Sequence, residues 1–279
     1  MFKIDTHHHF WRYNATEYPW ISDRMISIRR DFLPEHLQKE MAEAGITRTI
    51  AVQARQSLQE TGWLLDLASQ HSFILAVTGW APLTDPSVTD ILTTLASNPK
   101  LRSIRHVLQD EPDDLYMLRD DFNRGIRALK PLGLAYDILI FERHLPQTIQ
   151  FVDLHPDQIF ILDHLAKPRI KTGEITYWRK NILELAKRQN VYCKLSGLVT
   201  EADYEAWTDD QLRPYIDIAL EAFTPARLMF GSDWPVCLVA TTYGRWVAIV
   251  DHVMNKLSSS EQERFWYGTA MEAYGLKNG

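Results

Sequence analysis

Three consecutive histidines, His7, His8 and His9 in the stretch KIDTHHHFW, have the residue type and spacing of a possible metal or catalytic site. Side chains on a β-strand alternate between its two faces, so His7 and His9 point to one side and His8 points to the other. Asp5 lies one step deeper on the face shared by His7 and His9. Two imidazoles at one strand end can bind the same metal ion. We therefore expect His7 and His9 to belong to a site and His8 to lie outside it.

Two further residues would strengthen a metal site if the fold brings them close to this pair. His164 ends the apolar run 158–164, and Asp233 ends the run 227–233. A histidine nitrogen and a carboxylate oxygen are both common zinc ligands. The candidate site thus depends on whether the ends of three separate strands meet in space.

Eight short runs of apolar and β-branched residues recur along the chain, at residues 2–5, 48–53, 73–80, 101–107, 134–141, 158–164, 191–197 and 227–233. The segments between them with helical spacing include 33–45, 61–70, 120–133, 177–189 and 215–223. This alternation predicts parallel βαβ units, and eight units in about 250 residues match a (β/α)8 TIM barrel. Because no linker or composition break divides the chain, we expect a single domain over residues 1–279. A doubly wound open sheet is the alternative, but no glycine-rich phosphate loop follows the first run.

In a (β/α)8 barrel the active site lies at the carboxyl ends of the strands. The expected strand ends carry chemically capable side chains, namely His7, His9, Gln53, Arg55, Arg105, His106, Asp163, His164, Lys194, Ser196, Ser232 and Asp233. Adjacent residues on a strand face opposite ways. We therefore expect Arg105 to point inward and His106 outward, and Asp163 to face away from His164.

Composition favours a small molecule as the ligand. A formal net charge of −6 and a pI near 5.9 do not provide the basic face that nucleic acids or anionic membranes require. The two cysteines, Cys193 and Cys237, are too few for a disulfide framework. The amino terminus reaches charged residues too early for a signal peptide, and no apolar run approaches ~18 residues. We expect a cytoplasmic protein, and the sequence leaves its oligomeric state open.

Five separated stretches carry a family resemblance: DTHHHFW, YPWI, IRHVLQDEPD, LDHLAKP and FGSDWPVC. In this order they resemble signature blocks of the amidohydrolase superfamily, in its branch of sugar-acid lactonases, and the similarity runs from residue 3 to about 275. The resemblance implies an amidohydrolase-like barrel that opens an aldonolactone, such as L-fucono- or L-rhamnonolactone. It also implies that His7, His9, His164 and Asp233 are the metal ligands.

The fourth strand departs from a common pattern of that superfamily. Many members carry a carboxylated lysine there that bridges two metal ions, whereas this chain has Arg105 and His106. The resemblance therefore implies one divalent ion, zinc, with one open coordination position. More distant relatives that act on 2-pyrone-4,6-dicarboxylate are thought to work without a metal, so a dispensable ion is the alternative.

Opening a lactone requires an activated water and stabilisation of the oxyanion formed at the carbonyl. We expect Asp233 to act as the base that takes a proton from water and delivers it to the departing ring oxygen. Without a metal, His164 and Arg105 would have to stabilise the developing charge. Lys167, in the block LAKP, could serve a carboxylate or be solvated.

Aromatic faces pack against the C–H faces of sugars, and polar side chains bond sugar hydroxyls. We expect substrate contacts from residues at or just beyond strand ends or in the first long loop, namely Trp11, Trp20, Gln53, Arg55 and Trp80. Packing in the core is the alternative for each tryptophan, since the chain contains nine of them.

Two other functions are compatible with such a barrel. A 2-pyrone-4,6-dicarboxylate-type lactonase or a non-oxidative decarboxylase acts on carboxylated substrates, and would favour more arginines than Arg55 and Arg105. A barrel that only binds sugar would have no need for His7, His9 and Asp233 together.

Overall fold

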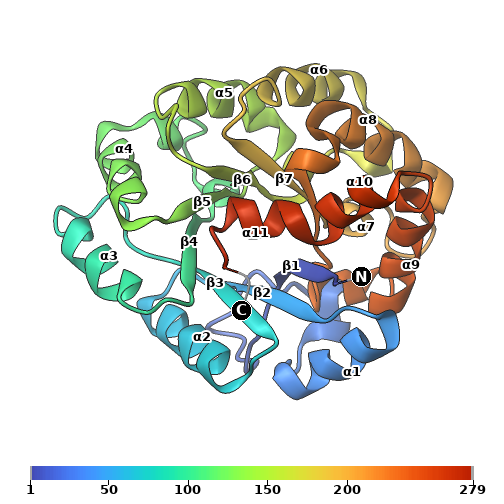
Figure 1. Cartoon of the computed structure of the whole chain (residues 1–279), viewed down its shortest axis with the longest axis horizontal. Coiled ribbons are helices and arrows are strands. Elements are labelled where there is room, and N and C mark those ends of the chain that lie inside the picture. Colours follow the sequence, from blue (N-terminus) through green and yellow to red (C-terminus); the bar gives the residue numbers. More distant parts are fainter. Residues whose placement is uncertain (1, 278–279) are drawn as a thin grey trace.

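The computed structural model describes residues 2–277 and contains an eight-stranded parallel sheet whose strands follow one another in sequence order (Figure 1). The strands are β1 (Ile4–His8), β2 (Arg48–Val52), β3 (Ile74–Gly79), β4 (Leu101–His106), β5 (Ala135–Ile138), β6 (Phe160–Leu162), β7 (Val191–Leu195) and β8 (Leu228–Phe230). Just beyond β8, the amide of Asp233 donates to the carbonyl of His7 at 2.8 Å, and the amide of His9 donates to the carbonyl of Trp234 at 2.7 Å. These bonds join the last segment of the sheet to the first, so the predicted (β/α)8 barrel is confirmed.

Helices surround the strands (Figure 1): α1 (Pro34–Ala44), α2 (Leu58–Gln70), α3 (Val88–Ala96), α4 (Asp120–Arg127), α5 (Leu145–Asp153), α6 (Thr176–Leu185), α7 (Leu198–Glu201), α8 (Asp209–Arg227), α9 (Tyr243–Met254), α10 (Ser259–Glu263) and α11 (Thr269–Ala273). Local sequence sets several of their ends. Proline at the first position begins α1, and Gly45 ends it in the left-handed conformation. The Ser57 hydroxyl caps α2 by accepting a hydrogen bond from the amide of Glu60.

The bounds of the predicted helices differ from those in the structure, and two of the differences have a clear local cause. The segment predicted as a helix over 120–133 divides into α4 and a 3-10 helix at Lys130–Leu132, because Pro131 lacks the amide that would continue the α-helix. The helix predicted to begin at residue 215 begins at Asp209. A capping box formed by Thr208 and Gln211 starts it earlier, and Pro214 is accommodated within it.

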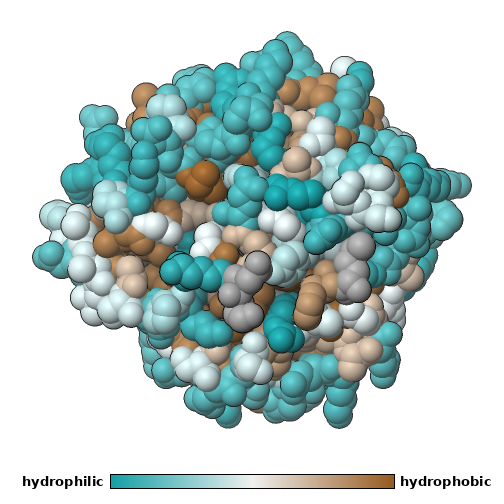
Figure 2. Space-filling view, viewed as in Figure 1, coloured by the Kyte–Doolittle hydropathy of each residue, from teal (hydrophilic) through white to brown (hydrophobic). Residues whose placement is uncertain are grey.

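The amino-terminal end of the barrel is closed by α11. Small and apolar side chains from this end of the strands pack against Ala270, Ala273 and Tyr274. Figure 1 views this end, with α11 lying across the strands. In the matching view of Figure 2, hydrophilic residues cover most of the surface and apolar residues form small separate patches. The polar strand ends lie at the opposite end of the barrel.

Helix length and polarity also bear on membrane insertion. Within residues 2–277, every helix is too short or too polar to cross a bilayer.

We predict that α4 depends on a glycine where it meets the chain after β3. A Cβ at Gly125 would lie 2.1 Å from the carbonyl oxygen of Leu83. Overpacking of this kind typically costs 1–3 kcal/mol, so Gly125→Ala should lower the free energy of unfolding by roughly 2 kcal/mol in urea titrations. Gly62 in α2 has no atom within 4 Å of such a Cβ, so Gly62→Ala should be neutral or stabilising by up to about 1 kcal/mol. Equal stabilities of the two variants would contradict this packing.

Candidate active site

Four side-chain atoms converge at the carboxyl end of the barrel, from β1, the segment after β6 and the segment after β8. His7 Nε2 lies 3.3 Å from His9 Nε2, and Asp233 Oδ1 lies 3.4 Å from His9 Nε2. Asp233 Oδ1 is also 3.8 Å from His7 Nε2 and 4.0 Å from His164 Nε2. The fold therefore brings together the four residues expected to form a metal site, and His7, His164 and Asp233 form a group able to hold an ion.

The donor atoms of this cluster suit a divalent metal such as zinc. Ligand atoms about 2.0–2.1 Å from a tetrahedral zinc lie about 3.4 Å from one another, close to the shorter separations observed. Burial lowers the pKa of His164 to about 4, although the nearby Asp233 carboxylate opposes the shift. Burial also lowers the pKa of His7 well below its usual range. Both imidazoles are therefore neutral near pH 7, and each can offer a nitrogen lone pair to a metal.

His164 begins a turn of four consecutive non-glycine residues in the left-handed conformation. The φ angles of residues 164–167 are 53°, 52°, 60° and 50°. Each such residue costs roughly 1–2 kcal/mol, so the surrounding structure must stabilise the turn. Because β6 ends at Leu162, strand alternation does not continue to His164. The alternation that placed Asp163 on the opposite face from His164 is therefore wrong. Both side chains are buried, with Asp163 against Arg105 and His7 and with His164 near Asp233.

A glycine and a serine after β7 hold the His164 ring. Gly197 has φ +66°, and a Cβ there would lie 2.6 Å from His164 Nδ1. Ser196 Oγ is hydrogen-bonded to the same nitrogen at 2.9 Å. The ring is thus oriented with Nε2 toward Asp233. Sequence analysis singled out Ser196 but missed Gly197, because a lone glycine after a strand carries no signal of what approaches it.

A network of buried charges lies beneath the cluster. Asp163 Oδ1 lies 2.9 Å from Lys194 Nζ and 3.3 Å from His7 Nδ1, while Asp163 Oδ2 accepts a 2.9 Å hydrogen bond from Arg105. Lys194 also donates to Asp137 at 2.5 Å. Burial would raise the pKa of Asp163, but Lys194, His7 and Arg105 outweigh it and hold the pKa well below its usual range. Asp163 Oδ1 and Lys194 Nζ, which lies 3.2 Å from the same nitrogen, both face His7 Nδ1, so Nε2 is the nitrogen turned toward the cluster.

Asp5 and His8 lie on β1 but outside the cluster. The Asp5 carboxylate accepts hydrogen bonds from the amides of His7 at 3.1 Å and Ser232 at 2.8 Å. It therefore ties β1 to the segment after β8. The His8 ring lies on the other face of the strand, 4.6 Å from the ring of Phe10 between centroids, as the alternation predicts.

Arg105 points inward from β4, and His106 points away from the barrel interior, as predicted. Arg105 Nη1 lies 3.3 Å from His7 Nε2, and its other terminal nitrogen donates to the carbonyl of Gln53. The His106 ring is hydrogen-bonded to Glu111 at 2.6 Å. Arg105 therefore places a cation beside the cluster at the end of β4.

A cavity of about 370 Å³ opens above the cluster. Its wall includes His9, Glu17, Trp20, Arg55, Arg105, Gln109, Asp110, His164, Lys167 and Asp233. Trp20 is 36% exposed, and its indole N–H donates to the carbonyl of Ala54 at 3.0 Å, which orients the ring. Arg55 is paired with Glu17 at 2.8 Å. Trp20 and Arg55 are thus positioned where a substrate could reach them.

Three residues expected to contact substrate do not line this cavity. Trp11 and Gln53 have no exposed surface. Trp11 packs in the aromatic core, and the Gln53 amide donates to the carbonyl of Arg105 at 3.4 Å. Trp80 is half-buried outside the cavity, with its amide bonded to the Thr61 hydroxyl at 2.9 Å. Position near a strand end did not distinguish side chains that line the mouth from those that pack behind it.

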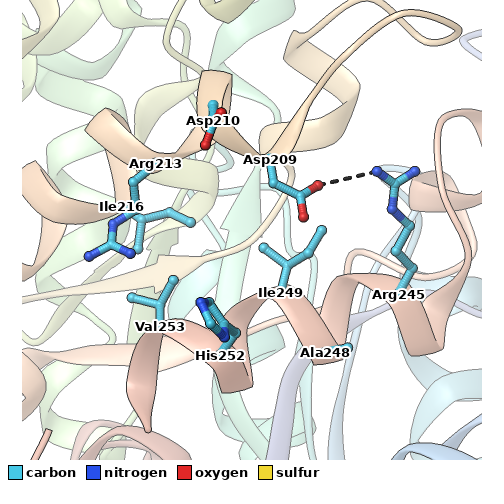
Figure 3. A pocket seen from close by; sticks show the side chains of 9 residues that line it. All are labelled: Asp209, Asp210, Arg213, Ile216, Arg245, Ala248, Ile249, His252 and Val253. Carbon is cyan, nitrogen blue, oxygen red and sulfur yellow. Dashed lines mark hydrogen bonds and ion pairs between the residues drawn. The ribbon is translucent and has the colours of Figure 1, made fainter. Parts of the chain in front are cut away.

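A second cavity, of about 450 Å³, lies between α8 and α9 (Figure 3). Apolar side chains, including Ile216 and Ile249, line part of it, and an ion pair of 3.2 Å joins Asp209 to Arg245 across it. His252 is the one histidine in its lining. Of these two cavities, the one above the His7, His9, His164 and Asp233 cluster is therefore the one with several possible metal ligands close together.

Comparisons with known proteins agree with this site. Residues 4–276 match the amidohydrolase family Amidohydro_2. The chain is 41% identical to an L-fucono-1,5-lactonase of Burkholderia multivorans, over 98% of this chain and 96% of that protein. It is 37% identical to an L-fucono-1,5-lactonase of Burkholderia ambifaria, over 99% and 96% respectively. The crystal structure of a Burkholderia multivorans amidohydrolase with bound zinc superposes with a TM-score of 0.96 at 41% identity, covering 99% of this chain and all of that one.

We predict that Gly197→Ala weakens zinc binding. The new Cβ would displace the His164 ring, and changes behind metal ligands typically cost 10–100-fold in affinity. Gly173→Ala is the matched control, because Gly173 has a similar φ of +72° but no atom within 4 Å of a Cβ. Competition with a chromophoric chelator would measure both affinities. Equal zinc affinities for the two variants would contradict the role assigned to Gly197.

Proposed function

The chain belongs to the amidohydrolase family, and on that premise we propose that it hydrolyses a sugar lactone such as L-fuconolactone to the aldonic acid. The observation that carries the proposal is the convergence of His7, His9, His164 and Asp233 beneath a cavity in a chain 41% identical to an L-fucono-1,5-lactonase. Lactonase chemistry is ester hydrolysis, in which water adds to the ring carbonyl and the ring C–O bond breaks. The net change consumes one water and releases one proton at neutral pH.

Asp233 is the proposed base. Burial would raise the pKa of Asp233, but the neighbouring His164 and His9 rings outweigh it and lower the pKa below 3.8. The carboxylate is therefore ionised at neutral pH and can accept a proton from water, then pass it to the ring oxygen as the C–O bond breaks. A zinc ion held by the cluster would polarise the carbonyl or lower the pKa of a water molecule.

Arg105 is the proposed electrostatic support for this step. Its guanidinium lines the cavity while bonded to Asp163 at 2.9 Å. A cation held in place beforehand needs little reorganisation when negative charge develops nearby. The hydrogen bonds to Asp163 and to the Gln53 carbonyl provide that rigidity.

The cavity favours an uncharged polyhydroxylated substrate over a dicarboxylate. Its volume of about 370 Å³ lies toward the small end of ligand sites and suits a single sugar ring. Trp20 offers an aromatic face, and Gln109 and Asp110 offer hydrogen-bonding groups. Both arginines of the wall are already paired with carboxylates, Arg55 with Glu17 and Arg105 with Asp163. A dicarboxylate would call for two cations without such partners, whereas among residues 2–277 Lys167 is the one lysine or arginine of this wall without an ion pair.

Proton release from a panel of aldonolactones, followed with a pH indicator, tests the function. We expect the wild type to open one sugar series and Asp233→Asn to lose at least about 100-fold in kcat/KM. The exposed carboxylate of Asp203 provides a control, Asp203→Asn, expected to match the wild type. Zinc content should be measured on each variant. Near-normal turnover by Asp233→Asn would show that this residue is not the base. If the wild type releases no proton from any lactone but releases carbon dioxide from a carboxylated aromatic compound, the decarboxylase alternative is favoured.

Metal removal should reversibly abolish turnover. Protein dialysed against a chelator is expected to lose lactonase activity, and one equivalent of zinc should restore it, because four donors from one cluster are available. Full activity of protein shown by elemental analysis to lack metal would instead favour the metal-independent reaction of the more distant relatives.

A further inference from the structure

The left-handed turn at residues 164–167 places two side chains in the wall of one cavity. His164 begins the turn and Lys167 ends it, and both line the space above Asp233. The amide of Lys167 donates to the carbonyl of His164 at 2.8 Å, which closes the turn. Pro168 follows and disfavours a right-handed helical conformation at Lys167. The metal-ligand turn therefore also delivers a primary ammonium group to the site.

Lys167 differs from the other cations of the cavity wall in having no ionic partner among residues 2–277. Arg55 and Arg105 are held by carboxylates at 2.8 Å and 2.9 Å. Lys167 Nζ instead lies over the ring of Phe141, 5.4 Å from its centroid. Its donors remain available to a ligand.

The surroundings of Lys167 are those of a reacting centre. Lys167 lines the same cavity as Asp233 and His164. It also opposes the burial that raises the pKa of Glu201, a side chain of α7. A strained backbone and a cation without an ion pair thus occur in the cavity lined by the buried Asp233 carboxylate, and strain of this kind concentrates at functional sites.

From this geometry we propose that Lys167 is a catalytic residue that donates hydrogen bonds to the acyl oxygen of the lactone and to the carboxylate of the product. The inference rests on the proposed function. When the water oxygen bonds to the carbonyl carbon, the carbonyl oxygen gains a negative charge. When the ring C–O bond breaks, the ring oxygen takes a proton and the acyl group leaves as a carboxylate with release of one proton. The interaction of Lys167 with the acyl oxygen strengthens as the negative charge grows.

The test compares Lys167→Met, Lys167→Arg and Lys167→Gly with the wild type on the lactone that it opens fastest. We expect Lys167→Met to lose at least about 100-fold in kcat, because removing an oxyanion donor typically has that effect. Inhibition by the product aldonate should weaken about tenfold or more. Lys167→Arg, which keeps the charge, should recover part of the activity. Lys171→Met, at an exposed lysine nearby paired with Asp203, is the control expected to retain wild-type activity.

Lys167→Gly separates catalysis from folding. Glycine adopts a φ of +50° without strain, so this variant should melt at or above the wild-type temperature while losing activity as Lys167→Met does. Zinc content should equal that of the wild type in every variant. The role is overturned if Lys167→Met turns over within about twofold of the wild type, if only KM changes, or if lost activity follows lost zinc.

These outcomes distinguish a failure of the role of Lys167 from a failure of the proposed lactonase function. A wild type that opens a sugar lactone alongside an equally active Lys167→Met overturns the lysine role alone. A wild type that opens no lactone contradicts the proposed function and removes the role with it.

Discussion

The carboxylate of Asp163 has no contact with solvent, and its charge is balanced by Lys194 and Arg105. Removing one partner of a buried pair strands the other charge and typically costs 3–5 kcal/mol, so these side chains have little freedom to move. The same carboxylate lies 3.3 Å from His7 Nδ1, and Arg105 Nη1 lies 3.3 Å from His7 Nε2. The position of His7 is thus set by a charge network that joins β4, β7 and the residue just after β6.

The barrel makes this network possible because side chains at or just beyond the ends of β1, β4, β5, β6 and β7 meet at a common centre. Tyr274, the residue just after α11, donates to Asp137 at 3.1 Å, so the network extends to the segment that closes the amino-terminal end of the barrel. From the side, Gly197 leaves room for the His164 ring. Packing and electrostatics therefore stabilise together the strained turn that presents His164 and Lys167 to the cavity.

Sequence patterns predicted the strands and their order, because strand runs are local signals. The family resemblance implied the four residues, His7, His9, His164 and Asp233, that the fold brings together. The patterns did not predict where alternation stops. Asp163 was expected to face away, yet the chain leaves the strand at Leu162 and turns both Asp163 and His164 inward. The sequence position of a tryptophan also does not show whether its side chain lines the cavity or packs in the core. Trp20 lines the cavity, whereas Trp11 packs behind it with no exposed surface. Both outcomes depend on contacts between segments far apart in sequence.

Anomalous diffraction at the zinc edge, from crystals of freshly purified and active protein, tests the central claim most directly. The account predicts one anomalous peak among His7 Nε2, His9 Nε2, His164 Nε2 and Asp233 Oδ1, with Arg105 and Lys194 still bonded to Asp163. An active crystal with no peak at this cluster, or with two peaks and Arg105 displaced, would contradict a mononuclear site organised by the buried Asp163 network.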